Sequence, residues 1–359
     1  MTGKVHPPFA LNALLTILSK AYGAGVGLRR DGYASGFLKA KKLPCTVISI
    51  GNLTTGGTGK TPMAIYVAER VRQLGYRVAV ISRGYKGAAE KSGGIVSDGS
   101  VILMDPHMAG DEPFLLAASL KGIPVLVGCD RYQSGMHAIN RFQTEVVILD
   151  DGFQHLSLFR DLNLLLLDSA FPFGNGHLLP RGTLREPSSA LRFGDALIMT
   201  RSPRPFCRPT ESWAMGRPAF CAIHEPFISR RFSAGEKLVF QTNGPLTGDE
   251  ILTNNRYYAF SGIADNEDFL KTLRKMGADV RGFQGFSDHH FYSAGDIQGI
   301  RNAAVNAGAT ALATTEKDLA RLHGRFQTPM DCVVIGIRMA LDDTIAFDRF
   351  IQNRISLAP

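Results

Sequence analysis

The 359-residue chain carries a formal net charge of +8 and is 45% hydrophobic and 20% charged, a composition typical of a globular protein with room for two domains. It has no low-complexity tract or internal repeat, which excludes a disordered or repeat protein, and its charge favours an acidic partner such as a nucleotide, a nucleic acid or an anionic membrane. Five scattered cysteines, without a CxxC or a zinc-type spacing, indicate a reducing compartment.

An apolar patch at residues 9–18 comes first in the chain. It is shorter than the roughly 20 apolar residues that span a bilayer, and only Lys4 precedes it, unlike the basic start of a signal peptide. More basic residues follow it: Lys20, Arg29, Arg30, Lys39, Lys41 and Lys42. This pattern fits a helix lying in an anionic membrane surface, and it also fits a helix packed on its own domain.

A βαβ unit follows. The β-branched run TVISIG at residues 46–51 predicts a buried strand, and RVAVIS at residues 77–82 predicts another. Between them, apolar residues recur at helical spacing: Met63, Val67, Val71 and Leu74. Pro62 suits the first turn of this helix and Gly75 its end, so two parallel strands are expected on either side of it.

The loop inside this unit, GNLTTGGTGKTP at residues 51–62, nearly matches the phosphate-loop pattern GxxxxGKS/T and departs from it at Thr54. Lys60 would reach the terminal phosphates, and the hydroxyl of Thr61 would bind Mg²⁺ at the start of the helix. The backbone N–H groups expected to surround the phosphates are those of Gly56, Gly57, Thr58 and Gly59. A chance glycine-rich turn is the alternative, but the position between a strand and a helix favours phosphate binding.

Further apolar runs of strand length lie at residues 122–128, 145–151, 162–168 and 195–200. Runs that are apolar throughout belong to strands covered on both faces. We therefore expect an α/β protein with a P-loop NTPase-type parallel sheet, helices on both faces, a second smaller α/β domain and an N-terminal interfacial helix. The predicted parts are the N-terminal helix and basic segment (1–43), the nucleotide-binding domain (44–200), a proline-rich linker (201–215) and the second domain (216–359).

Two adjacent acids, Asp150 and Asp151, end one of these strands. Strand ends face the ligand crevice of a parallel sheet, where a carboxylate can bind Mg²⁺ directly or through water. An ordinary acidic turn is the alternative, although two adjacent charges after four apolar residues are costly without a cation. His155, four residues on, could hydrogen-bond this cluster.

Two shorter motifs carry further candidates. AGDEP sets Asp111 and Glu112 before a predicted helix, where Asp111 could simply be the N-cap. SDHHFY places His289 beside His290, and adjacent histidines are poor metal ligands, so acid/base or orienting work is favoured.

Arginines form a third group, which is suited to phosphate recognition because the guanidinium binds two oxygens at once. They are Arg83, Arg131, Arg181 and Arg185. The TTEKD segment at residues 314–318 occupies the place of a guanine-specific NKxD motif but has the wrong order of residues, which argues against a GTPase.

Together these motifs resemble those of the tetraacyldisaccharide 4'-kinase family, the lipid A 4'-kinases of Gram-negative bacteria. The matching stretches, in order, are GNLTTGGTGKTP, SRGYKG, GDEP, DDGFQHLSLFRD, FGNGHLLPRGTLREP, FSDHHFY and TTEKD. They extend from about residue 46 to about residue 318, and DDGFQH and FGNGHLLP with LREP are more specific than the phosphate loop.

The resemblance implies that the γ-phosphate of ATP is transferred, with Mg²⁺, to the 4'-hydroxyl of a tetraacylated glucosamine disaccharide 1-phosphate to give lipid IVA. It also implies a peripheral, monotopic location at the cytoplasmic face of the bacterial inner membrane, with the anionic membrane surface as a partner. The second domain would close over the lipid disaccharide. Neither a nucleic acid nor an obligate protein partner is expected.

The resemblance also assigns roles to single residues. Asp111 matches the proposed catalytic base and His289 the histidine that assists it, while Asp150 and Asp151 match the metal-binding acids. Thr54 becomes part of a family-specific version of the ATP-binding loop. The candidates for contact with the substrate or the transferred phosphate are Arg83, Tyr85, Glu112, Arg131, His155, Arg185 and Glu186. A phosphate-loop ATPase that acts as a switch or partner-binding module would use the same loop and acids, and is the alternative.

Overall fold

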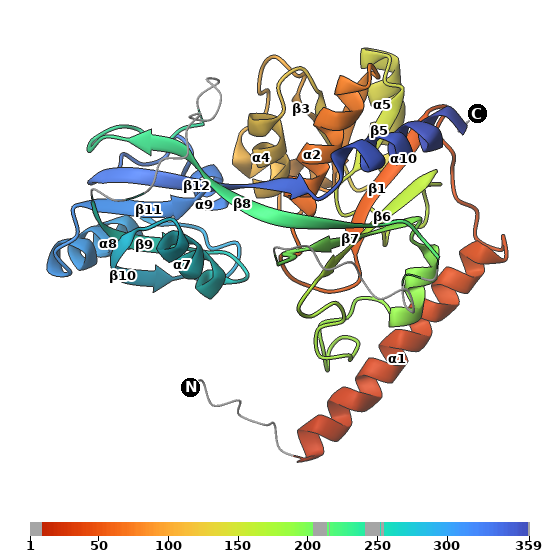
Figure 1. Ribbon diagram of the computed structural model, residues 1–359, viewed down its shortest axis with the longest axis horizontal. Coiled ribbons are helices and arrows are strands. Elements are labelled where there is room, and N and C mark those ends of the chain that lie inside the picture. The colour runs from red at the N-terminus through yellow and green to blue at the C-terminus, as the bar shows by residue number, and fades with distance from the viewer. Residues whose placement is uncertain (1–8, 204–213, 215, 241–251, 253–254, 358–359) are drawn as a thin grey trace. The chain divides into compact units, whose positions relative to one another are not determined.

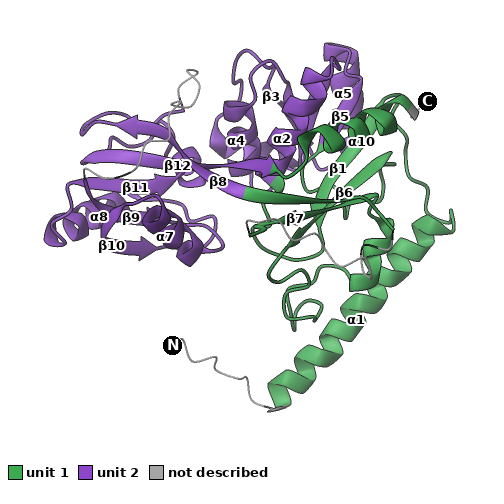
Figure 2. Ribbon diagram, viewed as in Figure 1, with its two compact units in different colours: residues 1–60, 149–223, 341–359 green, residues 61–148, 224–340 purple. Residues whose placement is uncertain are grey.

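The computed structural model describes residues 9–203, 214, 216–240, 252 and 255–357. It is an α/β protein with mostly parallel strands covered by helices, as the sequence predicts (Figure 1). Its contacts divide the chain into two compact units, coloured in Figure 2: unit 1 has residues 1–60, 149–223 and 341–359, and unit 2 has residues 61–148 and 224–340. Both units therefore combine separate stretches of chain, whereas the predicted domains are continuous. Most of the predicted linker lies outside the described residues.

Unit 1 contains four neighbouring strands in the order β8-β7-β6-β1, all parallel. They are β1 (Thr46–Asn52), β6 (Leu162–Asp168), β7 (Ala196–Thr200) and the first part of β8 (Ala219–Phe232). The first three are predicted strands and are buried over almost their whole length, because both of their faces are covered. β8 was not among the predicted strands.

Different elements cover the two faces of this sheet. Helix α10 (Thr344–Leu357) packs on the face of Phe220, whose ring centroid lies 5.1 Å from that of Phe347. On the other face, strand residues such as Leu165 pack against Phe153 and the 3-10 segment η2 (Ser188–Phe193). Gly51 pairs with Leu165 and so lies on this second face, where a Cβ would come within 2.3 Å of the Phe153 Cβ. The absence of a side chain at Gly51 thus lets the acidic turn pack directly on β1.

Helix α1 (Phe9–Ala34) is 26 residues long and includes the apolar patch, Lys20, Arg29 and Arg30. Residues Ala10–Ala34 are long and apolar enough to cross a membrane by length and composition, so the helix extends well beyond the predicted patch at residues 9–18. The helix contacts unit 1 through a narrow face, where Ser19 Oγ donates to the Leu178 carbonyl oxygen at 2.9 Å. Most of its large apolar side chains remain exposed: Leu11, Leu14, Ile17, Leu18, Tyr22 and Leu28.

The first part of unit 2 has the strand order β5-β2-β4-β3, with β2 and β4 parallel and β3 antiparallel. The strands are β2 (Val78–Ser82), β3 (Gly94–Ser97), β4 (Val125–Val127) and most of β5 (Val146–Leu149). The associated helices are α2 (Lys60–Gln73), η1 (Ala88–Glu90), α3 (Pro106–Ala109), α4 (Asp111–Ser119) and α5 (Arg131–Phe142). Helix α2 is the one predicted after the phosphate loop, and it buries Met63, Val67 and Val71 on one face, as expected.

The second part of unit 2 has the order β10-β9-β11-β12, parallel throughout. The strands are β9 (Arg256–Ser261), β10 (Asp279–Gly285), β11 (Ala311–Thr315) and β12 (Asp331–Leu341), with helices α7 (Asn266–Lys275), α8 (Ala294–Asn306) and α9 (Glu316–Leu322). Phe269 and Leu273 of α7 pack on the face that carries Ala259 and Ala313. This part is the predicted second α/β segment.

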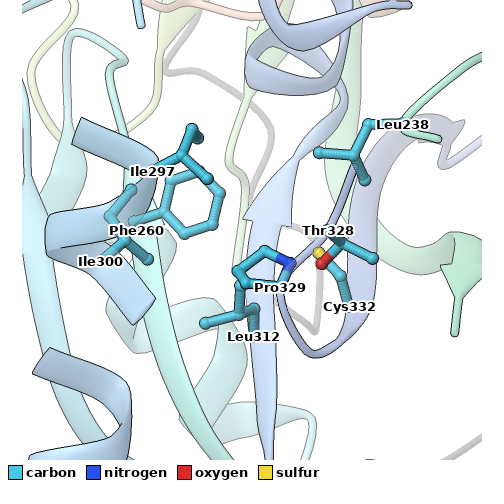
Figure 3. Close-up of a pocket in the computed structure, with 8 residues that line it drawn as sticks. All are labelled: Leu238, Phe260, Ile297, Ile300, Leu312, Thr328, Pro329 and Cys332. Atoms are coloured by element: carbon cyan, nitrogen blue, oxygen red, sulfur yellow. The ribbon is translucent and has the colours of Figure 1, made fainter. Parts of the chain in front are cut away.

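A small apolar pocket lies between α8 and the opposite face of these strands (Figure 3). Ile297 and Ile300 of α8 line it from one side, and Leu312 and Cys332 line it from the strands. Burial raises the pKa of the Cys332 thiol to about 12, so this sulfur stays protonated and packs as a small apolar group. The pocket is therefore part of the core and has no groups suited to catalysis.

Candidate active site

The phosphate loop of unit 1 is curved by glycines and held by one asparagine. Gly56 and Gly59 have φ values of 115° and 85°, which residues with a side chain rarely adopt. Asn52, at the end of β1, donates from Nδ2 to Thr58 Oγ1 at 2.9 Å and accepts from Lys60 Nζ at 3.2 Å. A Cβ on Gly56 would meet no atom within 4 Å, so the loop backbone faces open space.

Thr54 replaces the first glycine of the usual pattern without disturbing this geometry. It is buried and forms an antiparallel bridge with Leu184. On either side, the Thr55 N–H donates to the Thr183 carbonyl and the Arg185 N–H donates to the Leu53 carbonyl, both at 2.7 Å. An extended, strand-like residue needs no glycine, so the first half of this loop is fixed by pairing with residues 183–185.

The acidic turn after β5 faces the lysine of the loop. Asp151 lies 3.7 Å from Lys60 Nζ, and both of its carboxylate oxygens accept from Arg185 Nη1, at 2.9 and 3.0 Å. Asp150 is almost fully buried, with 1% of its surface exposed. The structure thus brings together three of the predicted site residues, Lys60, Asp151 and Arg185, from three separate motifs.

Two other candidates in unit 1 support this group. Glu186 is buried, and its carboxylate pairs with Arg30 of α1, whose guanidinium lies over the rings of Phe153 and Phe193. Burial raises the pKa of Glu186, and the Arg30 charge opposes this rise. His155 Nε2 lies 3.1 Å from Ser157 Oγ. Glu186 therefore connects the site segment to the N-terminal helix.

Unit 2 holds a second group, centred on Asp111. Its Oδ2 lies 3.0 Å from His289 Nδ1 and 2.6 Å from Arg321 Nε. The ring of Tyr85 meets the His289 imidazole edge-on, with 5.9 Å between centroids. Asp111 is the first residue of α4 and Gly110 is the N-cap, so the alternative role of Asp111 as N-cap is wrong. The sequence predicted the pair Asp111–His289, but it did not single out Arg321.

The charges around Asp111 keep its carboxylate ionised. Burial alone would raise its pKa, but the hydrogen bond with His289 and the charge of Arg321 outweigh this effect and hold the pKa below the usual range. At neutral pH the group is therefore a carboxylate that can accept a proton. The next residue, Glu112, accepts from Lys317 Nζ at 2.8 Å, so helix α9 contacts both acids in the first turn of α4.

The remaining candidates lie elsewhere in unit 2. Arg83 is more than half exposed and its Nε donates to Glu90 at 2.6 Å. Arg131, at the start of α5, is buried and its Nη1 donates to the carbonyl oxygens of Gly128 and Cys129, both at 3.3 Å. Among the residues that the structure describes, no cluster of three or more His, Cys, Asp or Glu side chains could hold a metal.

Residues 11–356 match the family model described as tetraacyldisaccharide-1-P 4'-kinase. The chain is similar to the tetraacyldisaccharide 4'-kinase of Desulfatibacillum aliphaticivorans (41% identity, covering 96% of this chain and 93% of that protein) and to that of Syntrophus aciditrophicus strain SB (42%, covering 97% and 94%). Among solved structures it is similar to LpxK from Aquifex aeolicus in complex with ATP, with a TM-score of 0.75, 34% identity and coverage of 96% of this chain and 99% of that one.

Proposed function

We propose that Asp111 is the catalytic base of this chain, which belongs to the tetraacyldisaccharide-1-phosphate 4'-kinase family. Its family makes it an ATP-dependent kinase of lipid A biosynthesis that phosphorylates the 4'-hydroxyl of a lipid disaccharide. The observation that carries this proposal is the position of the Asp111 carboxylate between His289 and Arg321. A sugar hydroxyl is a poor nucleophile, so its proton must be accepted as the new P–O bond forms.

His289 supports the base from one side. Its Nδ1 is within hydrogen-bond distance of Asp111, and its backbone has a φ of 59°, which is uncommon outside glycine. The N–H of His289 donates to Asp288 Oδ1 at 3.0 Å and to the Gly262 carbonyl at 3.2 Å, and these bonds hold the unusual conformation. His289 would orient the carboxylate, so that one oxygen remains directed toward the acceptor hydroxyl.

The nucleotide would be bound by the loop of unit 1. Its open glycine backbone suits the phosphate oxygens of ATP, and Lys60 is within reach of them at the start of α2. Arg185, which pairs with Asp151, would help to neutralise the phosphoryl group during transfer.

Mg²⁺ fits the donors that are present. The Thr61 hydroxyl and the carboxylates of Asp150 and Asp151 are the oxygen ligands that Mg²⁺ prefers, and one or two carboxylates commonly hold it beside substrate phosphates. When bound, the ion would draw negative charge from the phosphates. The loop would orient the nucleotide, Lys60 and Arg185 would offset the negative charge of its phosphates, and Asp111 would accept the proton of the hydroxyl.

The acyl chains of the acceptor require a location at a membrane. Helix α1 exposes a row of apolar side chains and carries Lys20 and Arg29, as expected for a helix at an anionic membrane surface. We place the enzyme at the cytoplasmic face of the bacterial inner membrane, where ATP is available, with α1 as its contact with lipid.

The test of the base is D111N, which keeps the size of the side chain and removes its ability to accept the proton. Transfer of label from [γ-³²P]ATP to the lipid disaccharide in detergent should fall by about 10²–10⁴-fold, while ATP binding stays within about twofold. Wild-type phosphorylation of lipid by D111N would refute the assignment. If the wild-type protein released label only as free phosphate, the ATPase switch would replace the lipid kinase as the function.

A further inference from the structure

The TTEKD segment at residues 314–318 leads directly into the site. β11 ends at Thr315 and α9 begins at Glu316, so Lys317, Asp318 and Arg321 lie on the first two turns of that helix. Lys317 contacts Glu112 and Arg321 contacts Asp111, which are consecutive residues at the start of α4. Helix α9 is thus joined by two ion pairs to the first turn of α4.

Arg321 contacts several segments of this group. Its side chain is 4% exposed, and three acids from three segments surround it: Asp111 at 2.6 Å, Asp318 at 3.0 Å and Asp288 at 3.9 Å. Its Nη1 also donates to the carbonyl of Gly262, the same oxygen that accepts from the His289 N–H. One guanidinium therefore contacts the base directly and helps to hold the turn that bears its histidine.

Asp318 holds this guanidinium in place. It is fully buried, and Oδ1 accepts from Arg321, from the Tyr292 hydroxyl at 2.9 Å and from the Gly262 N–H at 3.0 Å. Its other oxygen accepts from Thr315 Oγ1 at 2.6 Å. A buried carboxylate with this many donors is fixed in orientation, and so is the cation that it binds.

We propose that Arg321 is the positioning residue of the phosphoryl transfer: anchored by Asp318, it holds the Asp111 carboxylate in one orientation and keeps His289 beside it. The inference rests on the proposed role of Asp111 as the base. Arg321 acts through Asp111 and need not touch ATP or the sugar. Lysine has no fork and cannot serve Asp111, Asp318 and the Gly262 carbonyl together, so R321K should also be impaired.

The charges facing Asp111 give the direction of the pH effect. They are His289 and Arg321 in direct contact, Glu112 with Lys317 one residue away, and Asp288 and Asp318 behind Arg321. Loss of Arg321 removes the cation that favours the ionised carboxylate of Asp111. The pKa of Asp111 would rise, and the acidic limb of the kcat/KM profile would move to higher pH.

The experiment is a double-mutant cycle on the full-length enzyme, with lipid phosphorylation as the assay. R321M and R321K should each lower kcat by about tenfold or more, leave the KM for ATP within about twofold and move the acidic limb upward. In the D111N background the same changes should have almost no further effect, because the group through which Arg321 acts is gone. R301M, at an exposed position of α8, is the matched control and should behave as wild type.

The outcomes separate the two assignments. Wild-type activity of D111N would refute the base itself. Suppose that D111N is impaired. The inference is then wrong, and Arg321 has only a structural role, if R321M and R321K keep the wild-type kcat and pH profile. It is also wrong if they lower the rate equally in the wild-type and D111N backgrounds. If R321M shows no cooperative thermal transition, R321K, which keeps the positive charge, decides the question.

Discussion

Replacing Gly51 by alanine would place a methyl group between β1 and the acidic turn. The new Cβ would lie 2.3 Å from the Phe153 Cβ, 3.0 Å from its backbone nitrogen and 3.2 Å from its Cα. Carbon atoms in contact are about 3.5–4.0 Å apart, so the turn must move by about 1 Å or more. Two of the three close atoms are backbone, and a side-chain rotation at Phe153 cannot relieve the clash.

The cost follows from this geometry. Adding a methyl group to a well-packed core destabilises by about 1–3 kcal/mol, which for a chain of this size corresponds to a Tm lower by about 1–4 °C. The shift would also displace Asp151, two residues before Phe153, from Lys60 and Arg185. We therefore expect G51A to lower both the Tm, measured by circular dichroism, and the affinity for ATP, measured by calorimetry.

Gly57 provides the matched comparison, because a Cβ there would meet no atom within 4 Å and its φ is not positive. G57A should keep the wild-type Tm and weaken only ATP binding, since the methyl group would project toward the space where phosphate is expected. A wild-type Tm for G51A would show that the turn is not packed on β1 as described. An unchanged ATP affinity for G57A would refute the proposed phosphate position.

Three further predictions concern α1 and the base. Because Ile17 and Leu28 are 66% and 74% exposed, the double variant I17D/L28D should leave the Tm unchanged but weaken flotation with anionic vesicles by at least about tenfold. Unchanged flotation would exclude α1 as the membrane contact. R30M should lower the free energy of unfolding, measured in urea, by about 3–5 kcal/mol because it leaves Glu186 buried without its cation. The double variant R30M/E186Q should recover much of this loss, and no recovery would show that the ion pair is not the cause. Because the pKa of Asp111 is lowered in the folded state, its ionised form stabilises the protein above the ordinary aspartate pKa of about 3.9, and this contribution is lost as the pH falls through the folded pKa. Acid should therefore destabilise the wild-type protein more steeply than D111N. Parallel curves of stability against pH would contradict the assigned pKa direction.

Much of the fold could be predicted because its strands are buried on both faces. β1, β2, β6 and β7 are buried over nearly their whole length, and their sequences are rich in apolar and β-branched residues. β8 was missed because its 14 residues mix buried and half-buried positions and include Pro226, Arg230 and Arg231. The length of α1 was underestimated because the predicted patch stopped at Leu18, while the helix continues through four glycines to Ala34.

The site was predictable where its residues lie in compact motifs. Lys60, Asp151, Asp111 and His289 all stand in short segments with an evident chemistry, and the structure brings the first two together and, separately, the last two. Arg321 was missed because it lies outside such a segment and because its partner Asp111 is 210 residues away. The available signal was the spacing of Asp318 and Arg321, three residues apart on one helix.

The contact of α1 with residues 185 and 186 would link the proposed lipid contact to the proposed nucleotide site. The Tyr22 hydroxyl donates to the Arg185 carbonyl at 2.9 Å, Arg30 pairs with Glu186, and the side chain of Arg185 holds Asp151 beside Lys60. Two consecutive residues thus receive the helix on one side and support the phosphate loop on the other. If a detergent detaches α1 from residues 185 and 186 and so weakens ATP binding, thermodynamic reciprocity requires that bound ATP makes this detachment harder by the same factor. The choice of membrane mimetic would then change the measured ATP affinity.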